Sequence, residues 1–134
     1  MSIPKLIKIY DLKNDHRYIE AIQKATLNTP NFGFKPNNGL FGSSEWWAAV
    51  QNGVIPAKII EGKISNISMG CNRDFPEFEI SSATETKGWP RFGDSDAYKI
   101  GKKARITYIV QERKQPLGKE THSDIILTVE IDED

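Results

Sequence analysis

The chain has 134 residues, of which 38% are hydrophobic, with 18 Lys and Arg balanced by 18 Asp and Glu. This length predicts a single domain, residues 1–134, able to bury enough surface to fold without a metal or a disulfide. The lone Cys71 excludes an internal disulfide and an all-cysteine zinc site. Because there is no apolar run of about 18 residues and no signal-peptide pattern, we expect a cytoplasmic protein that does not enter a membrane.

Residues 1–57 are predicted to form helices and loops. The short segment 4–10 is interpreted as an edge strand, and residues 14–27 as an amphipathic helix capped by Asn14 or Asp15. The apolar stripe of this helix consists of Tyr18, Ala21, Ile22 and Ala25.

A second, shorter helix is expected to begin after Ser43 and to end at Gly53, with residues 29–42 forming a loop between the helices. Five aromatic residues fall within the sixteen residues 32–47: Phe32, Phe34, Phe41, Trp46 and Trp47. We interpret them mainly as a second core layer. Adjacent helical residues point about 100° apart, so one of the two tryptophans can remain accessible.

Residues 58–132 are predicted to form an antiparallel sheet or barrel. In the strand 59–69 the apolar positions change parity, and one extra residue near Ser65 and Asn66 would restore a single apolar face as a β-bulge. Gly62 in the same strand fits a bend.

Another strand is expected at residues 75–83, with Phe78 and Ile80 facing inward. A polar loop, residues 84–96, follows it. The loop carries Trp89, Arg91 and Phe92. Such side chains either fold back onto the sheet or face a partner, and tryptophan and arginine are enriched at the energetic centres of protein interfaces. With Trp47, they are the candidate partner-binding residues.

Two long strands, residues 103–113 and 123–132, are expected to pair across the loop 114–121. Ala104, Ile106, Tyr108 and Val110 are predicted to face the core. The matching register places Arg105 opposite Glu130, so that each charge neutralises the other.

The predicted fold is therefore α+β: a small curved antiparallel sheet or partly open barrel with two helices packed on one face or end. By fold-level analogy it looks like small OB-type or SH3-like barrels, which host many unrelated functions. Ile109 and Ile126 lie on the otherwise polar side of the sheet, where a helix could dock.

The favoured function is a non-catalytic cytosolic module that binds a protein partner. One alternative is a small barrel that binds single-stranded nucleic acid through a cluster of cations beside Arg91. These cations are Lys99, Lys102, Lys103 and Arg105. The balanced net charge and the expected pairing of Arg105 with Glu130 both disfavour it, because neutralised cations release few counterions from phosphates.

The other alternative is a small-ligand carrier or enzyme with a site at the barrel mouth, near Cys71, His122 or the loop 84–96. The sequence favours a protein that is not an enzyme, because no nucleophile, base or metal-ligand pattern is evident. We accordingly predict no catalytic residue, no cofactor and no metal. The oligomeric state is left open.

Overall fold

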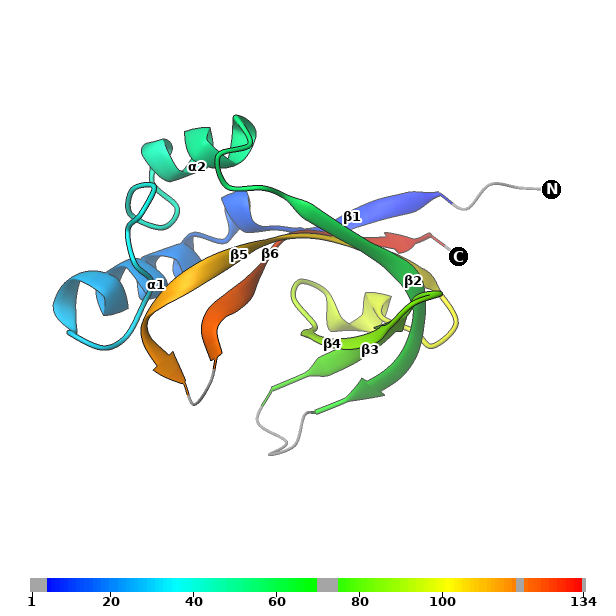
Figure 1. Cartoon of the computed structure of the whole chain (residues 1–134). Helices are drawn as coiled ribbons and strands as arrows, with labels where there is room; N and C mark the ends of the chain where they lie inside the picture. The colour runs from blue at the N-terminus through cyan, green and yellow to red at the C-terminus, as the bar shows by residue number, and fades with distance from the viewer. Residues whose placement is uncertain (1–4, 70–74, 118–119, 134) are drawn as a thin grey trace. The chain divides into compact units, whose positions relative to one another are not determined.

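The structure is a computed structural model that describes residues 5–69, 75–117 and 120–133 (Figure 1). Its elements in chain order are β1 (Leu6–Asp11), the 3₁₀ turn η1 (Leu12–Asn14), α1 (His16–Asn28), α2 (Ser44–Gln51), β2 (Lys58–Ser68), β3 (Glu77–Ser81), β4 (Thr86–Pro90), the 3₁₀ turn η2 (Ser95–Ala97), β5 (Lys103–Leu117) and β6 (Glu120–Asp132).

The six strands form one antiparallel sheet in the order β1-β6-β5-β2-β3-β4. The sheet is not closed, since β1 and β4 lie at its two ends. The predicted α+β class with a curved sheet is confirmed, whereas the analogy to a small barrel is not. The edge strand predicted at residues 4–10 is confirmed from Leu6 onward by β1, while Pro4 lies outside the described residues.

The chain folds into two compact units, which we describe separately. The strand unit consists of the described residues within Met1–Asp11, Ile59–Thr107 and Thr128–Asp134. The helix unit consists of those within Leu12–Lys58 and Tyr108–Leu127. Strands β5 and β6 therefore contribute residues to both units.

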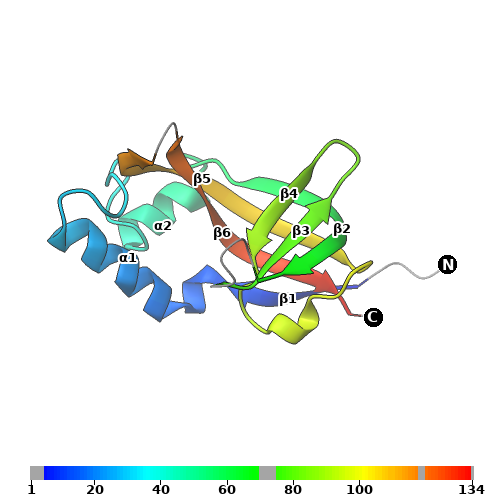
Figure 2. The same ribbon diagram turned by 90° about the horizontal axis from the view of Figure 1, so that it is seen from below.

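In the strand unit, β2, β3 and β4 form a three-stranded meander (Figure 2). Ile64 pairs with Ile80 but Asn66 pairs with Glu79, so that Ser65 is the extra residue of a β-bulge, as predicted. Because Gly62 has no side chain, β2 can approach Ser81 closely. A β-carbon at residue 62 would collide with the Ser81 carbonyl oxygen. The buried hydrophobic residues of this unit are Tyr10, Ile60, Ile64, Phe78, Ile80, Trp89, Tyr98, Ala104, Ile106, Val129 and Ile131.

The segment predicted as a long polar loop, residues 84–96, instead contains β4 and η2. Trp89 lies opposite Phe78 in the β3–β4 pairing, and both side chains are buried. β4 has only one large apolar residue, so its sequence shows no alternating pattern. Pairing with β3 makes it a strand.

In the helix unit, Asp15 caps α1 by accepting a hydrogen bond from the Tyr18 amide, and Ser43 caps α2 in the same way. The predicted stripe of α1 is partly wrong, because Ala21 is exposed and the buried positions are Ile19 and Thr26. Thr26 can be buried because its hydroxyl group is hydrogen-bonded to the backbone on both sides.

The prediction for β5 is correct in its first half only. Ala104 and Ile106 are buried in the strand unit, whereas Tyr108 and Val110 are half-buried. In the helix unit the buried positions are Ile109 and Gln111, which have the opposite parity. On this face, the Trp46 indole of α2 donates a hydrogen bond of 3.1 Å to the Gln111 side chain.

Ile109 and Ile126, where the sequence left room for a helix to dock, are both buried. The predicted contact between Arg105 and Glu130 is also present, with 3.7 Å between their charged atoms. The loop between the long strands is shorter than the predicted residues 114–121, since β5 continues to Leu117 and β6 begins at Glu120.

Replacing Gly62 with alanine should destabilise the protein by about 1–3 kcal/mol, because the new methyl group would collide with the Ser81 carbonyl. Gly88→Ala is the matched control: its β-carbon would have no neighbour nearer than the Phe78 carbonyl oxygen at 4.0 Å. We expect Gly88→Ala to change stability by less than about 0.5 kcal/mol. Urea unfolding of both variants measures the difference, and equal stabilities would contradict the close approach.

Candidate protein-binding surfaces

Of the two arrangements expected for the side chains of residues 89–92, folding back onto the sheet is the one that Trp89 adopts. The Trp89 side chain is only 3% exposed and lies in the core of the strand unit, with the Lys87 ammonium 4.8 Å from the ring centre. The expectation that the Trp89 ring faces a partner is therefore corrected: in the free protein it packs against the sheet.

Arg91 and Phe92 are half-buried beside two exposed apolar residues. The Arg91 guanidinium donates a 3.0 Å hydrogen bond to the Ser68 carbonyl, and its backbone amide donates to Pro76. Met69 and Phe75 are 45% and 44% exposed. We call Met69, Phe75, Arg91 and Phe92 the Phe75 patch.

The aromatic members of the Phe75 patch rest on the strand unit. The Phe92 ring lies 4.9 Å from that of Tyr10 and 6.0 Å from that of Phe75, and the Tyr98 hydroxyl donates to the Phe92 carbonyl at 2.6 Å. Burial raises the pKa of Tyr98, so its phenol stays protonated and keeps this bond. A role for Arg91 and Phe92 in partner binding remains a prediction.

The two adjacent tryptophans differ in exposure, as expected from their positions on α2. Trp46 is 1% exposed, whereas Trp47 is half-buried and packs edge-on against it, with the Lys13 ammonium 5.3 Å from a Trp47 ring centre. Trp47 is thus accessible from outside, and its role in partner binding also remains a prediction.

The cations proposed for nucleic-acid contact differ in their surroundings. Lys103 and Arg105 both form ion pairs with Glu61. The hydrogen bond from Arg105 to the Glu61 carboxylate raises the pKa of the Arg105 guanidinium. The Lys102 ammonium donates to the Asp132 carbonyl, while Lys99 is exposed. No observation tests nucleic-acid binding, which stays a prediction.

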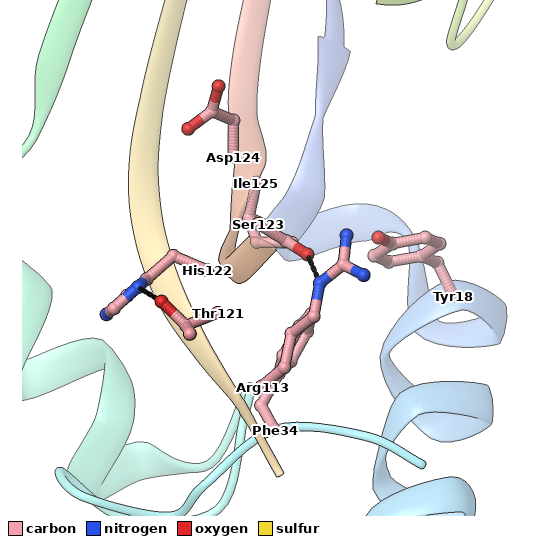
Figure 3. A pocket seen from close by; sticks show the side chains of 8 residues that line it. All are labelled: Tyr18, Phe34, Arg113, Thr121, His122, Ser123, Asp124 and Ile125. Carbon is pink, nitrogen blue, oxygen red and sulfur yellow. Dashed lines mark hydrogen bonds between the residues drawn. The ribbon is translucent and has the colours of Figure 1, made fainter. Parts of the chain in front are cut away.

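An open pocket of about 600 Å³ lies in the helix unit (Figure 3). Its lining residues are Tyr18, Phe34, Arg113, Thr121, His122, Ser123, Asp124 and Ile125. The Arg113 guanidinium points toward the Tyr18 ring and donates a 2.6 Å hydrogen bond to the Ser123 hydroxyl. Burial, with the nearby Asp15 charge, raises the pKa of Tyr18, which is therefore a neutral phenol at physiological pH.

The pocket does not present an evident catalytic pair. The His122 ring is hydrogen-bonded to the Thr121 hydroxyl at 2.6 Å, and Figure 3 shows both pointing away from the Arg113 guanidinium. Cys71, considered above with His122, lies outside the described residues. In the part of the chain that the structure describes, no three His, Cys, Asp or Glu side chains are grouped to hold a metal.

The loop after α1 carries a surface residue that the sequence analysis assigned to a core layer. Phe34 and Phe41 are buried, as expected for a core layer, but Phe32 is 70% exposed. Leu27, in the last turn of α1, is exposed to the same extent. The only signal in the sequence is the Pro30-Asn31 pair before Phe32, which marks a turn.

An α+β fold that holds arginine and aromatic side chains on structured loops is suited to binding another macromolecule. Among the described residues, no helix is long and apolar enough to cross a membrane. The family model for immunity protein RhsI2 matches residues 6–132. The chain therefore belongs to the immunity protein RhsI2 family. No curated protein matches it. Membership in this family supports the predicted non-catalytic, protein-binding role.

Iodide should quench the fluorescence of Trp47 and leave Trp46 and Trp89 protected, because only Trp47 has an accessible ring. In a Trp47→Phe variant the remaining emission should be almost insensitive to iodide. Quenching of that variant to the level of free tryptophan would show that Trp89 or Trp46 faces solvent.

Proposed function

We propose that this chain is an immunity protein that binds a toxin protein and blocks it by occupying its surface. The observation that carries the proposal is the family match, which spans residues 6–132 and so includes both compact units. A match of this extent concerns the whole fold and not one shared motif.

The way in which the side chains are held supports a binding role. In the strand unit, Arg91 is held by its hydrogen bond to the Ser68 carbonyl. In the helix unit, Arg113 is held by its hydrogen bond to the Ser123 hydroxyl. A side chain that is already ordered loses less conformational entropy when a partner binds. Arginine and aromatic groups presented in this way are typical of the residues that dominate interface energies.

Inhibition by occupation also agrees with the chemistry of the pocket. Its polar groups are the Arg113 guanidinium bound to the Ser123 hydroxyl, the Tyr18 phenol kept neutral by burial, the Asp124 carboxylate, and the His122 ring bound to Thr121. The one hydroxyl held by an imidazole, Thr121 beside His122, belongs to two adjacent exposed residues that point away from the Arg113 guanidinium. We therefore expect the toxin to be bound and released chemically unchanged.

Co-expression with toxin domains from the same genome tests the proposal. We expect one of them to stop the growth of a bacterial host, the present chain to restore growth, and the two proteins to purify as a complex with a dissociation constant below about 10⁻⁷ M. The mass of the recovered toxin should be unchanged.

The control is the same toxin domain with its active site inactivated, which should still bind. Protection without a complex, or a toxin whose mass has been altered by the chain, would contradict the proposal and indicate a catalytic role.

A further inference from the structure

We infer that Phe32 is the principal anchor by which the helix unit binds the toxin, and that the toxin receives it in an apolar socket with acidic residues at its rim. This inference rests on the proposed function. It names the surface and the chemistry of the partner, which the family match does not.

Two threonines hold the loop that carries Phe32 on its helix side: Thr26 of α1, and Thr29, the C-cap of α1. The Thr29 hydroxyl accepts a 3.1 Å hydrogen bond from the Phe32 amide and donates a 2.7 Å bond to the Ala25 carbonyl. The Thr26 hydroxyl accepts from the Phe34 amide at 3.2 Å. The amides on both sides of Gly33 are thus bound to α1.

Gly33 itself brings the loop into close contact with the helix. Its φ of +91° is in the left-handed region, and a β-carbon there would lie 2.7 Å from the Thr26 backbone nitrogen. Only glycine allows this approach, which fixes the direction in which the chain leaves Phe32.

Strand β5 holds the same loop from the other side. The Lys114 ammonium binds the carbonyl oxygens of Thr26 and Thr29 at the end of α1, and the Lys114 amide donates to the Gly33 carbonyl at 3.2 Å. A cation at the C-terminus of a helix is favoured by the helix dipole. Phe34 also forms a β-bridge with Arg113.

Despite this anchorage, the Phe32 side chain is 70% exposed. The fold thus fixes the backbone around a large apolar ring that contributes little buried area to its own core. An aromatic ring on a backbone that is already fixed binds without the entropic cost of ordering its loop, which suits an interface anchor. Leu27, in the last turn of α1, is equally exposed.

The charge of the helix unit indicates the polar character of the partner. Residues 12–58 and 108–127 contain eight Lys and Arg against six Asp and Glu, an excess of two positive charges. Phe34, two residues after Phe32, lines the same pocket as the Arg113 guanidinium and the Asp124 carboxylate. An acidic rim around the socket would complement these charges and accelerate association.

The Phe75 patch is the main rival, and two differences favour Phe32. Phe75 is 44% exposed against 70% for Phe32, and its ring already packs against Phe92. The patch therefore contributes to the surface of the strand unit, whereas Phe32 has most of its ring left for a partner.

The test measures the affinity of the full chain for the toxin domain identified by co-expression, with its active site inactivated, by titration calorimetry. We expect Phe32→Ala to weaken binding at least 30-fold without lowering the melting temperature, since the ring is mostly exposed. Ile100→Ala is the matched control, because Ile100 is 67% exposed in the strand unit; its affinity should stay within threefold of the wild type.

A second variant tests the rigidity of the loop. Thr29→Val keeps the shape of the side chain but removes its hydrogen bonds to the Phe32 amide and the Ala25 carbonyl. We expect about tenfold weaker binding with the ring still present, because the loop must then be ordered on association. Because the proposed rim is acidic, association of the wild-type chain with the toxin should also slow at high salt.

The inference would be overturned if Phe32→Ala bound the toxin within threefold of the wild-type affinity. It would also be overturned if Phe75→Ala weakened binding at least 30-fold while Phe32→Ala did not. If sedimentation shows that Phe32→Ala dissociates a dimer of this chain while toxin binding is unchanged, the ring instead binds a second copy and the inference is wrong. Failure of the wild type to bind any toxin would overturn the proposed function, and the inference with it.

Discussion

Residues 33–35 run beside β5 in an antiparallel direction, and the helix unit depends on this attachment. The Lys35 amide donates to the Glu112 carbonyl at 3.0 Å, and the Lys114 amide donates to the Gly33 carbonyl at 3.2 Å. The Lys35 ammonium and the Glu112 carboxylate form an ion pair at 2.7 Å. Hydrogen bonds from Lys35 and Asn37 lower the pKa of the Glu112 carboxyl, so it stays ionised at neutral pH. The segment between the two helices is therefore joined to a strand along its backbone.

The buried Gln111 amide shows why this attachment is specific. Its oxygen accepts a hydrogen bond from the Trp46 indole, and its nitrogen donates to the Lys35 carbonyl at 3.2 Å. A buried amide with both ends satisfied is stable, whereas one that lost a partner would carry a desolvation cost of about 1–3 kcal/mol. Helix α2, the loop at residue 35 and strand β5 are thus joined through one side chain. The same attachment leads the chain into the loop that displays Phe32.

Much of the fold could be predicted from local patterns in the sequence. The long strands, the bulge at Ser65 and the cap at Ser43 each follow from a few neighbouring residues and are present. Other features depend on distant partners. β4 is a strand because it pairs with β3, and after Ile106 the buried face of β5 is the one on which Gln111 meets Trp46 of α2. No rule based on neighbouring residues contains these contacts.

The candidate site was harder to predict than the fold, for the same physical reason. Sequence composition drew attention to Trp89, whose ring is in the core, and assigned Phe32 to a core layer, although it is exposed. Whether an aromatic ring is buried depends on which backbone groups hold its loop. For Phe32 these are Thr29, Gly33 and Lys114, which are up to 85 residues apart.

We propose that the loop carrying Phe32, already ordered in the free protein, is the surface that the toxin covers. Amide hydrogen exchange, measured on the chain alone and in its complex with the toxin domain, tests this claim directly. We predict that the amides of residues 32–35 exchange slowly in the free chain, and that residues 27–33 gain the largest additional protection in the complex. Rapid exchange of residues 32–35 in the free chain, or protection confined to the strand unit in the complex, would contradict it.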